Sequence, residues 1–151
     1  MKKLKFDLGF KEYEIGGGVL RFNPNDLGVY SRFSEAGNRL ADVEKDMVAK
    51  AKNVGPEDKG EAVLKLLADA DREIKKILAW IFGEHNDFDA IFGGVNVMST
   101  GSNGERIITN FIHAIQPVLE EGAKQCADQQ VAGAASKANM NRAQRRAAGI
   151  K

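Results

Sequence analysis

Hydrophobic and polar residues alternate at the start of the chain and recur at helical spacing after it. Leu4, Phe6 and Leu8 alternate with charged residues, which is the period of a half-buried strand. A second short strand is predicted to end near Ile15. The glycines at 16–18 favour a turn, after which "VLRF" continues as the returning strand. We therefore expect an N-terminal β-hairpin or a small three-stranded meander.

Long amphipathic helices are predicted to follow. Asn25 or Asp26 can cap the first one, because their side chains accept hydrogen bonds from a helix N-terminus. Its apolar residues recur at three-, four- and seven-residue steps as far as about Lys52, although a glycine at position 37 could interrupt it. The second helix has an unbroken apolar stripe over residues 63–81.

A third long helix is predicted beyond a glycine-rich segment, in which only one short helical turn over residues 88–92 is expected. Ser102 precedes Glu105 by three residues, the spacing of a capping box, and an apolar stripe over residues 107–119 comes directly after it. Pro117 lies inside this stripe and predicts a kink, because proline removes one helical hydrogen bond.

The last part of the chain has little to bury. Residues 127–139 are rich in Ala, Gly and Gln, which is typical of a linker or a frayed helix. The sequence thus predicts a mainly α protein, in which a folded domain over residues 1–125 carries the N-terminal hairpin and three long amphipathic helices. Residues 126–151 are predicted to form a flexible, Ala-rich basic tail.

Charge separates this tail from the body. The whole chain carries a formal +1, but residues 129–151 carry +5 and residues 1–128 carry −4. Arg142, Arg145 and Arg146 would share one face of a short helix, which we expect to dock on a protein partner. Nucleic acid is a less favoured partner, because no aromatic residues lie among the arginines and the body is acidic.

Composition sets the class of protein. A chain of 151 residues is one ordinary domain, and its single cysteine cannot form an intrachain disulfide. The sequence has no run of eighteen apolar residues, and its start lacks the apolar stretch of a secretion signal. We expect a soluble cytoplasmic protein that does not enter the membrane.

Candidate catalytic and metal-binding residues are few. His85 lies near Asp87 and Asp89 in a loop, where turn formation explains the same residues as well as a metal site would. His113 falls on the polar side of its helix, and Cys126 has no base near it in sequence. We expect no catalytic residue, no metal and no cofactor.

Two further patterns point away from enzymatic chemistry. The glycine-rich segments lack the Lys-Ser or Lys-Thr that a phosphate-binding loop requires. Asp69, Asp71 and Glu73 lie among basic residues and predict a mixed, solvated helix face. The interpretation is a binding protein that is not an enzyme.

Two stretches carry a family resemblance. "EIGGGVLRFNPNDLGVYSRF" resembles small proteins encoded among the tail genes of long-tailed bacteriophages, and "NRAQRRAAGIK" resembles the basic ending of phage tail assembly chaperones. The resemblance implies a mostly helical, non-enzymatic protein of the host bacterial cytoplasm. Such a protein binds the tape measure protein, with the tail-tube protein as a second partner, and promotes tail-tube assembly.

Two other functions fit the same residues. A structural virion component, such as a tail-completion or connector protein located in the virion tail, is the main alternative, and a small nucleic-acid-binding protein is a weaker one. Trp80 and Phe82 widen the apolar face of the second helix, so we expect both to contact the partner together with the three arginines. Self-association is also left open.

Overall fold

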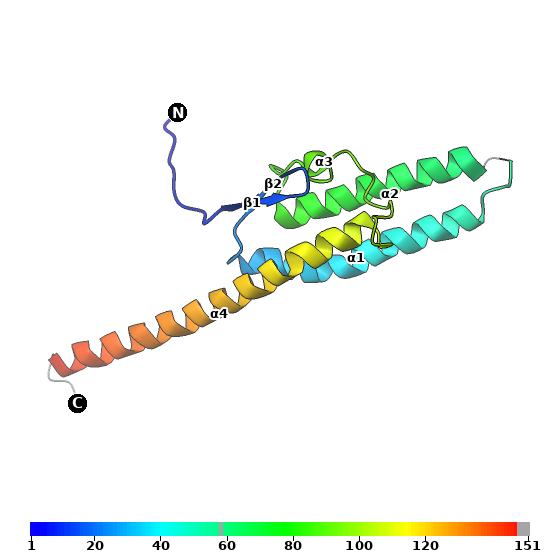
Figure 1. Ribbon diagram of the computed structural model, residues 1–151. Coiled ribbons are helices and arrows are strands. Elements are labelled where there is room, and N and C mark those ends of the chain that lie inside the picture. Colours follow the sequence, from blue (N-terminus) through cyan, green and yellow to red (C-terminus); the bar gives the residue numbers. More distant parts are fainter. Residues whose placement is uncertain (58, 148–151) are drawn as a thin grey trace.

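The structure is a computed structural model that describes residues 1–57 and 59–147, with side chains described as far as residue 133. An antiparallel two-stranded hairpin precedes a mainly helical body (Figure 1). The elements in chain order are β1 (Lys11–Ile15), β2 (Gly18–Phe22), α1 (Leu27–Lys52), α2 (Lys59–Phe82), α3 (Phe88–Ile91) and α4 (Ile107–Ala147). The predicted fold class of a mainly α protein with an N-terminal hairpin is confirmed.

The hairpin has a two-residue turn and a single register. Lys11 lies opposite Phe22, Tyr13 opposite Leu20 and Ile15 opposite Gly18. Gly16 in the turn has φ +56°, a conformation that favours glycine. The meander prediction is wrong, because the alternating segment before the hairpin pairs with no strand within the described residues.

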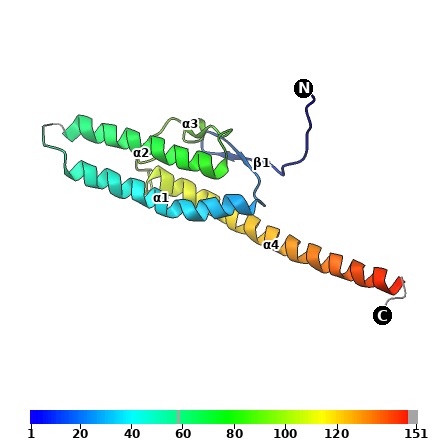
Figure 2. The same cartoon turned by 180° about the vertical axis from the view of Figure 1, so that it is seen from behind.

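α1 and α2 form an antiparallel pair, against which the first half of α4 packs (Figures 1 and 2). The predicted cap of α1 is Asp26, whose Oδ1 accepts a hydrogen bond from the Gly28 amide at 2.8 Å. α1 continues through Gly37 without a break. The core joins residues of the hairpin, all four helices and the loop before α4, namely Leu20, Phe22, Val29, Ala36, Ala70, Ile74, Ile77, Leu78, Ile81, Phe82, Phe88, Ile91, Phe92, Val97, Met98, Ile108, Phe111, Ile115 and Leu119.

Aromatic contacts join the hairpin to the helices. The ring of Phe82 packs against those of Phe22 and Phe111, at centroid distances of 5.1 and 6.2 Å. The Gly17 amide also donates to the Ile91 carbonyl oxygen at 3.0 Å. A two-stranded sheet alone is marginal in water, so these contacts stabilise the hairpin.

α4 begins differently from the prediction. The capping box of Ser102 and Glu105 is wrong, because α4 starts at Ile107 and its first amides bond to the preceding loop. The Ile107 amide donates to the Ser99 carbonyl at 2.9 Å, and the Ile108 amide donates to the Val97 carbonyl at 2.9 Å. Backbone oxygens of the folded loop therefore replace the side-chain cap.

The rest of α4 is one continuous helix (Figure 1). It passes through Pro117 without a break, and the carbonyl that proline leaves without a helical partner belongs to the exposed residue His113. The kink at Pro117 stays a prediction. The segment 127–139, predicted as a linker or frayed helix, has a helical backbone. Among the described side chains, Cys126 is the last one that is partly buried.

Candidate partner-binding surfaces

The two aromatic residues predicted to bind a partner lie in different environments. Trp80 is 40% exposed on α2, and the guanidinium of Arg39 on α1 stacks 4.7 Å from the centroid of its ring. Phe82 is only 3% exposed and belongs to the core. The placement of Phe82 on a contact surface is therefore wrong, because the hairpin and α4 cover the face of α2 on which it lies.

The three arginines at the end of the chain lie on the last turns of α4. Their backbone is helical, but the side chains of Arg142, Arg145 and Arg146 lie outside the described residues. α4 extends well past the α1–α2 pair at its C-terminal end (Figures 1 and 2). Their shared face and their docking role stay a prediction.

An open groove lies between α1 and α4. Its volume is about 370 Å³, and it is lined by Tyr30, Phe33, Ser34, Gly37, Leu40, Ile112, Gln116, Leu119 and Glu120. Apolar side chains from both helices line it, and polar ones complete the wall. A Cβ placed on Gly37 would meet no atom within 4 Å, so the groove is open above α1 at this point. Two helices with apolar side chains between them form the kind of surface that accepts a third helix.

A second groove, between α1 and α2, has a different character. It measures about 530 Å³ and is lined mostly by charged residues, including Asp42, Asp46, Lys50, Asp69, Arg72 and Glu73. Several of these charges already pair within the protein, as in the 2.9 Å ion pair between Lys50 and Asp46. This groove is a less suitable surface for an apolar helix than the groove between α1 and α4.

A third surface, which is apolar, is the N-terminal arm, residues 1–10, which extends away from the body (Figure 1). Leu4, Phe6 and Leu8 are 89%, 79% and 52% exposed. The sequence pattern predicts that these residues are half-buried in a sheet, and nothing within the described part of the chain covers them. Three large apolar side chains in a row on one exposed segment are typical of an interaction site.

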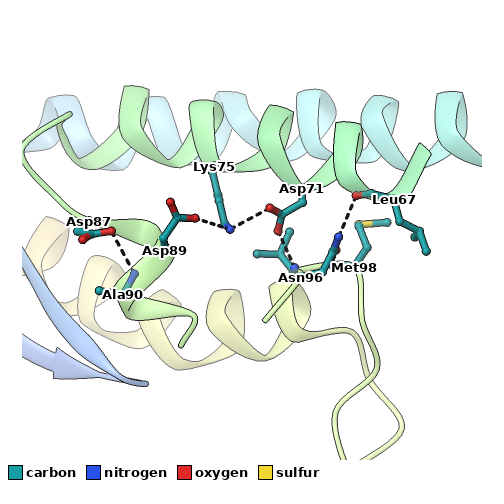
Figure 3. Close-up of polar contacts among 9 residues, drawn as sticks. Leu67, Asp71, Lys75, Asp87, Asp89, Ala90, Asn96 and Met98 are labelled. Carbon is teal, nitrogen blue, oxygen red and sulfur yellow. Dashed lines mark hydrogen bonds and ion pairs between the residues drawn. The ribbon is translucent and has the colours of Figure 1, made fainter. Parts of the chain in front are cut away.

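A polar cluster fixes the loop before α4 to α2 (Figure 3). Asp71 bonds through Oδ1 to the Val97 amide at 2.9 Å and through Oδ2 to the Lys75 Nζ at 2.8 Å. Lys75 also donates to Asp89 at 2.7 Å, which ties α3 to the same site. Asn96 donates to the Leu67 carbonyl at 3.0 Å.

The electrostatics of this cluster favour a structural role. Burial by itself lowers the pKa of Lys75, but its hydrogen bonds to Asp71 and Asp89 outweigh burial, so the pKa is raised. A lysine that is held protonated is a poor nucleophile or base. Sequence reasoning predicted a solvated face here, whereas the Asp71 and Lys75 side chains are only 16% and 18% exposed. The i, i+4 spacing of Asp71 and Lys75 indicates that the two side chains can form an ion pair, but it does not show which other segment of the chain buries them.

The loop residues considered as metal ligands have separate structural roles. His85 Nε2 lies 2.8 Å from the Arg21 carbonyl oxygen, and the Asp87 side chain caps α3 by accepting from the Ala90 amide. Asp89 pairs with Lys75. Among the side chains that the structure describes, no group of three or more from His, Cys, Asp or Glu is arranged to hold a metal ion.

Sequence reasoning also missed Asn86, a buried residue that secures the outer edge of β2. Its Oδ1 accepts from the Arg21 amide at 2.7 Å and its Nδ2 donates to the Arg21 carbonyl at 3.1 Å. One side chain thus satisfies both backbone groups of a strand residue, as a neighbouring strand would.

Comparisons with protein-family models, with curated proteins and with solved structures found no match to this chain. Within the described residues, no helix is both long and apolar enough to cross a membrane.

Proposed function

We propose that this protein is a phage tail assembly chaperone, a non-enzymatic protein that binds the tape measure protein and promotes tail-tube assembly around it. The resemblance of "EIGGGVLRFNPNDLGVYSRF" and "NRAQRRAAGIK" to proteins of that kind suggests the partner. The structural observation that supports it is the open apolar groove between α1 and α4.

The groove suits the expected partner. A tape measure protein is a long helical chain with exposed apolar surface, according to the same resemblance. A helix of that kind can place apolar side chains between Phe33 and Leu40 of α1 and Ile112 of α4. Polar groups at Gln116 and Glu120 remain available for the rim of such an interface. The basic end of α4 would then attract the partner at longer range.

The test is co-expression with the tape measure protein, followed by measurement of how much of it stays soluble and co-purifies. Gly37→Trp should place a large side chain in the groove, and its Cβ meets no atom within 4 Å. Gly60→Trp is the matched control, since Gly60 is also helical, also has open space at its Cβ, and does not line the groove. We expect Gly37→Trp to reduce recovery of the complex by about tenfold and Gly60→Trp to leave it unchanged.

Two further variants separate the contributions of the body and of the tail to binding of the tape measure protein. A chain ending at Asp128, and one with Arg142, Arg145 and Arg146 changed to alanine, should retain part of the binding and lose its long-range, salt-dependent component. Failure of the unchanged chain to bind the tape measure protein would refute the proposal. Detection of the chain in purified virions by mass spectrometry would instead favour a structural tail component.

Salt-sensitive DNA binding tighter than about 1 µM would favour the nucleic-acid alternative, if it disappears in the arginine-to-alanine chain.

A further inference from the structure

The two strands of the hairpin differ in how their outer edges are closed. On β2, the Asn86 side chain bonds both backbone groups of Arg21, and His85 Nε2 lies 2.8 Å from the same carbonyl oxygen. On β1, the backbone groups of Glu12 and Glu14 point away from β2, because the pair next to a two-residue turn bonds inward and the direction then alternates. Within the described residues, no hydrogen bond reaches these groups from outside the hairpin. β1 therefore has a free edge.

An apolar cavity lies at the end of this edge, beside the hairpin turn. Its volume is about 310 Å³, and it is lined by the turn, the end of α3 and the first turns of α4. Of the described side chains that line it, Asn110 alone is polar, and Ile15 of β1 is one of the apolar ones. Ligand pockets begin at about this size. The cavity can therefore hold an apolar side chain from another molecule.

The core face of β1 is the face that leads to this cavity. Tyr13 lies opposite Leu20, which is fully buried, so Tyr13 and Ile15 are on the core side of the sheet. Both are half-buried. A strand added to the free edge would direct every second side chain to the same side, and the one opposite Ile15 would point to the cavity. Apolar residues are favoured at these positions.

The other face of the edge is acidic. Glu12 and Glu14 are exposed, and within the described residues neither takes part in an ion pair. Arg21 lies opposite Glu12, but its guanidinium stacks 4.8 Å from the centroid of the Phe10 ring. Glu14 lies opposite Val19, which carries no charge. Basic side chains of an added strand would thus meet two available carboxylates.

The N-terminal arm of the same chain does not cover this edge, because contacts on the β2 side hold its base. Asn23 Nδ2 donates to the Leu8 carbonyl oxygen at 3.0 Å. Gly9 has φ +71°, and its amide donates to Asp7 Oδ1 at 2.7 Å. From this bend the arm leads away from the body (Figure 1). The edge and the cavity are therefore open to another molecule.

We infer that the free edge of β1 and the adjoining cavity form a docking site for an extended segment of a partner protein in which basic and apolar residues alternate. The segment adds a third strand whose backbone bonds Glu12 and Glu14. Its basic side chains lie beside the two carboxylates, and its apolar side chains lie beside Tyr13 and in the cavity. Main-chain hydrogen bonds supply affinity in this mode of binding, and the alternate side chains supply specificity. The added strand also extends a two-stranded sheet that is marginal by itself.

This inference goes beyond the proposed function. The groove between α1 and α4 suits a helix, whereas the edge of β1 suits an extended chain. The two sites have no lining residue in common. Each can therefore be tested without the other.

Fluorescence anisotropy of a labelled peptide measures the docking. The probe, Thr-Lys-Phe-Lys-Phe-Lys-Thr, reads the same in both directions, so it fits a parallel and an antiparallel strand. We expect the unchanged chain to bind it with a Kd of about 100 µM or tighter. The reordered peptide Thr-Lys-Lys-Lys-Phe-Phe-Thr should bind about tenfold more weakly, because its charged and apolar side chains do not alternate. The probe with methylated backbone amides should lose binding similarly, because it cannot donate to β1.

Exchanging the charges tests the acidic face. Glu14→Lys should weaken binding of the probe by about tenfold. Glu61→Lys is the matched control, because Glu61 is in the first turn of α2 and the hairpin packs against Phe82 at the other end of that helix. A chain with both Glu12→Lys and Glu14→Lys should instead prefer the acidic peptide Thr-Glu-Phe-Glu-Phe-Glu-Thr. Circular dichroism checks that each variant is folded.

Filling the cavity tests its part in the site. Ala114 is exposed and lines the cavity, so Ala114→Trp should weaken binding of the probe by about tenfold. Ala127 is also exposed on α4 and does not line the cavity, so Ala127→Trp should leave binding unchanged.

Several results would overturn the inference. These are a Kd for the probe weaker than about 1 mM, equal binding of the alternating and reordered peptides, or equal effects of Glu14→Lys and Glu61→Lys. Self-association of the unchanged chain in sedimentation velocity, if Glu14→Lys abolishes it, would also overturn it, because a second copy would then occupy the edge. Binding of the tape measure protein is not measured in these assays, so their failure would leave the proposed function standing.

Discussion

Replacing Gly122 with alanine should destabilise the protein, although the same replacement stabilises most exposed helix positions. Gly122 lies in α4 where the helix crosses the segment that joins β2 to α1. A Cβ at this position would overlap the Pro24 carbonyl oxygen and lie 2.7 Å from its carbonyl carbon. Both contacts are with backbone, so neither can be relieved by a side-chain rotation.

Gly37→Ala supplies the reference. Gly37 is also inside a helix, and its Cβ would meet no atom within 4 Å. Alanine is favoured over glycine in a helix by about 1 kcal/mol, so Gly37→Ala should raise the free energy of unfolding by that amount. Gly122→Ala gains the same propensity but adds overpacking, which costs about 1–3 kcal/mol or more. The difference between the two variants therefore isolates the clash with Pro24.

Urea denaturation followed by circular dichroism measures both free energies. In thermal unfolding of the same variants, we expect a Tm rise of about 2–4 °C for Gly37→Ala and a fall for Gly122→Ala, since 1 kcal/mol shifts a domain of this size by that much. Equal stabilisation by the two replacements would refute the reasoning, because it would mean that α4 does not pack against the β2–α1 connection. An unchanged m-value checks that the comparison concerns the native state.

Three further predictions concern the polar cluster, the core and the tail. Because the pKa of Lys75 is raised in the folded protein, its stabilising effect is present below the ordinary pKa of 10.5 and is lost as the pH rises through the folded-state pKa. The free energy of unfolding, measured from pH 9 to 12, should therefore fall more in the unchanged chain than in Lys75→Arg. Parallel curves for the two chains would contradict this. Phe82→Ala should cost about 3–5 kcal/mol in urea denaturation and Trp80→Ala clearly less, because Trp80 is 40% exposed, while similar losses would contradict their different burial. Deleting residues 127–151 should leave thermal unfolding nearly unchanged, and a loss above about 2 kcal/mol would show that this segment is part of the domain.

Local pattern was sufficient for most of the secondary structure. The spacing of apolar residues predicted that the first helix ends at about Lys52, where α1 does end, and the stripe over 63–81 lies within α2. Asp26 as a cap, the glycine turn of the hairpin and the short helix α3 were also predicted. These features depend on side-chain periodicity and on the conformational preferences of a few residues, which are both properties of adjacent positions.

The structural predictions that failed concern features that depend on contacts between segments distant in the sequence. Ser102 and Glu105 have capping-box spacing, but the loop folds so that carbonyl groups of Val97 and Ser99 reach the start of α4 first. Asp71 and Lys75 look like surface charges on an isolated helix, and become mostly buried because the loop and α3 lie over them. Local spacing identifies a suitable side chain, but it does not show which distant group will occupy its hydrogen bonds.

For the candidate sites, the sequence alone determined which residues are apolar and tertiary structure decided which of them remain exposed. Trp80 and Phe82 are two residues apart on α2, and only Phe82 faces the hairpin and α4. The arm has a strand's alternation, yet bonds at its base direct it away from its own sheet. The physical reason is that periodicity is a local property of the chain, whereas burial depends on the surfaces that other segments leave uncovered.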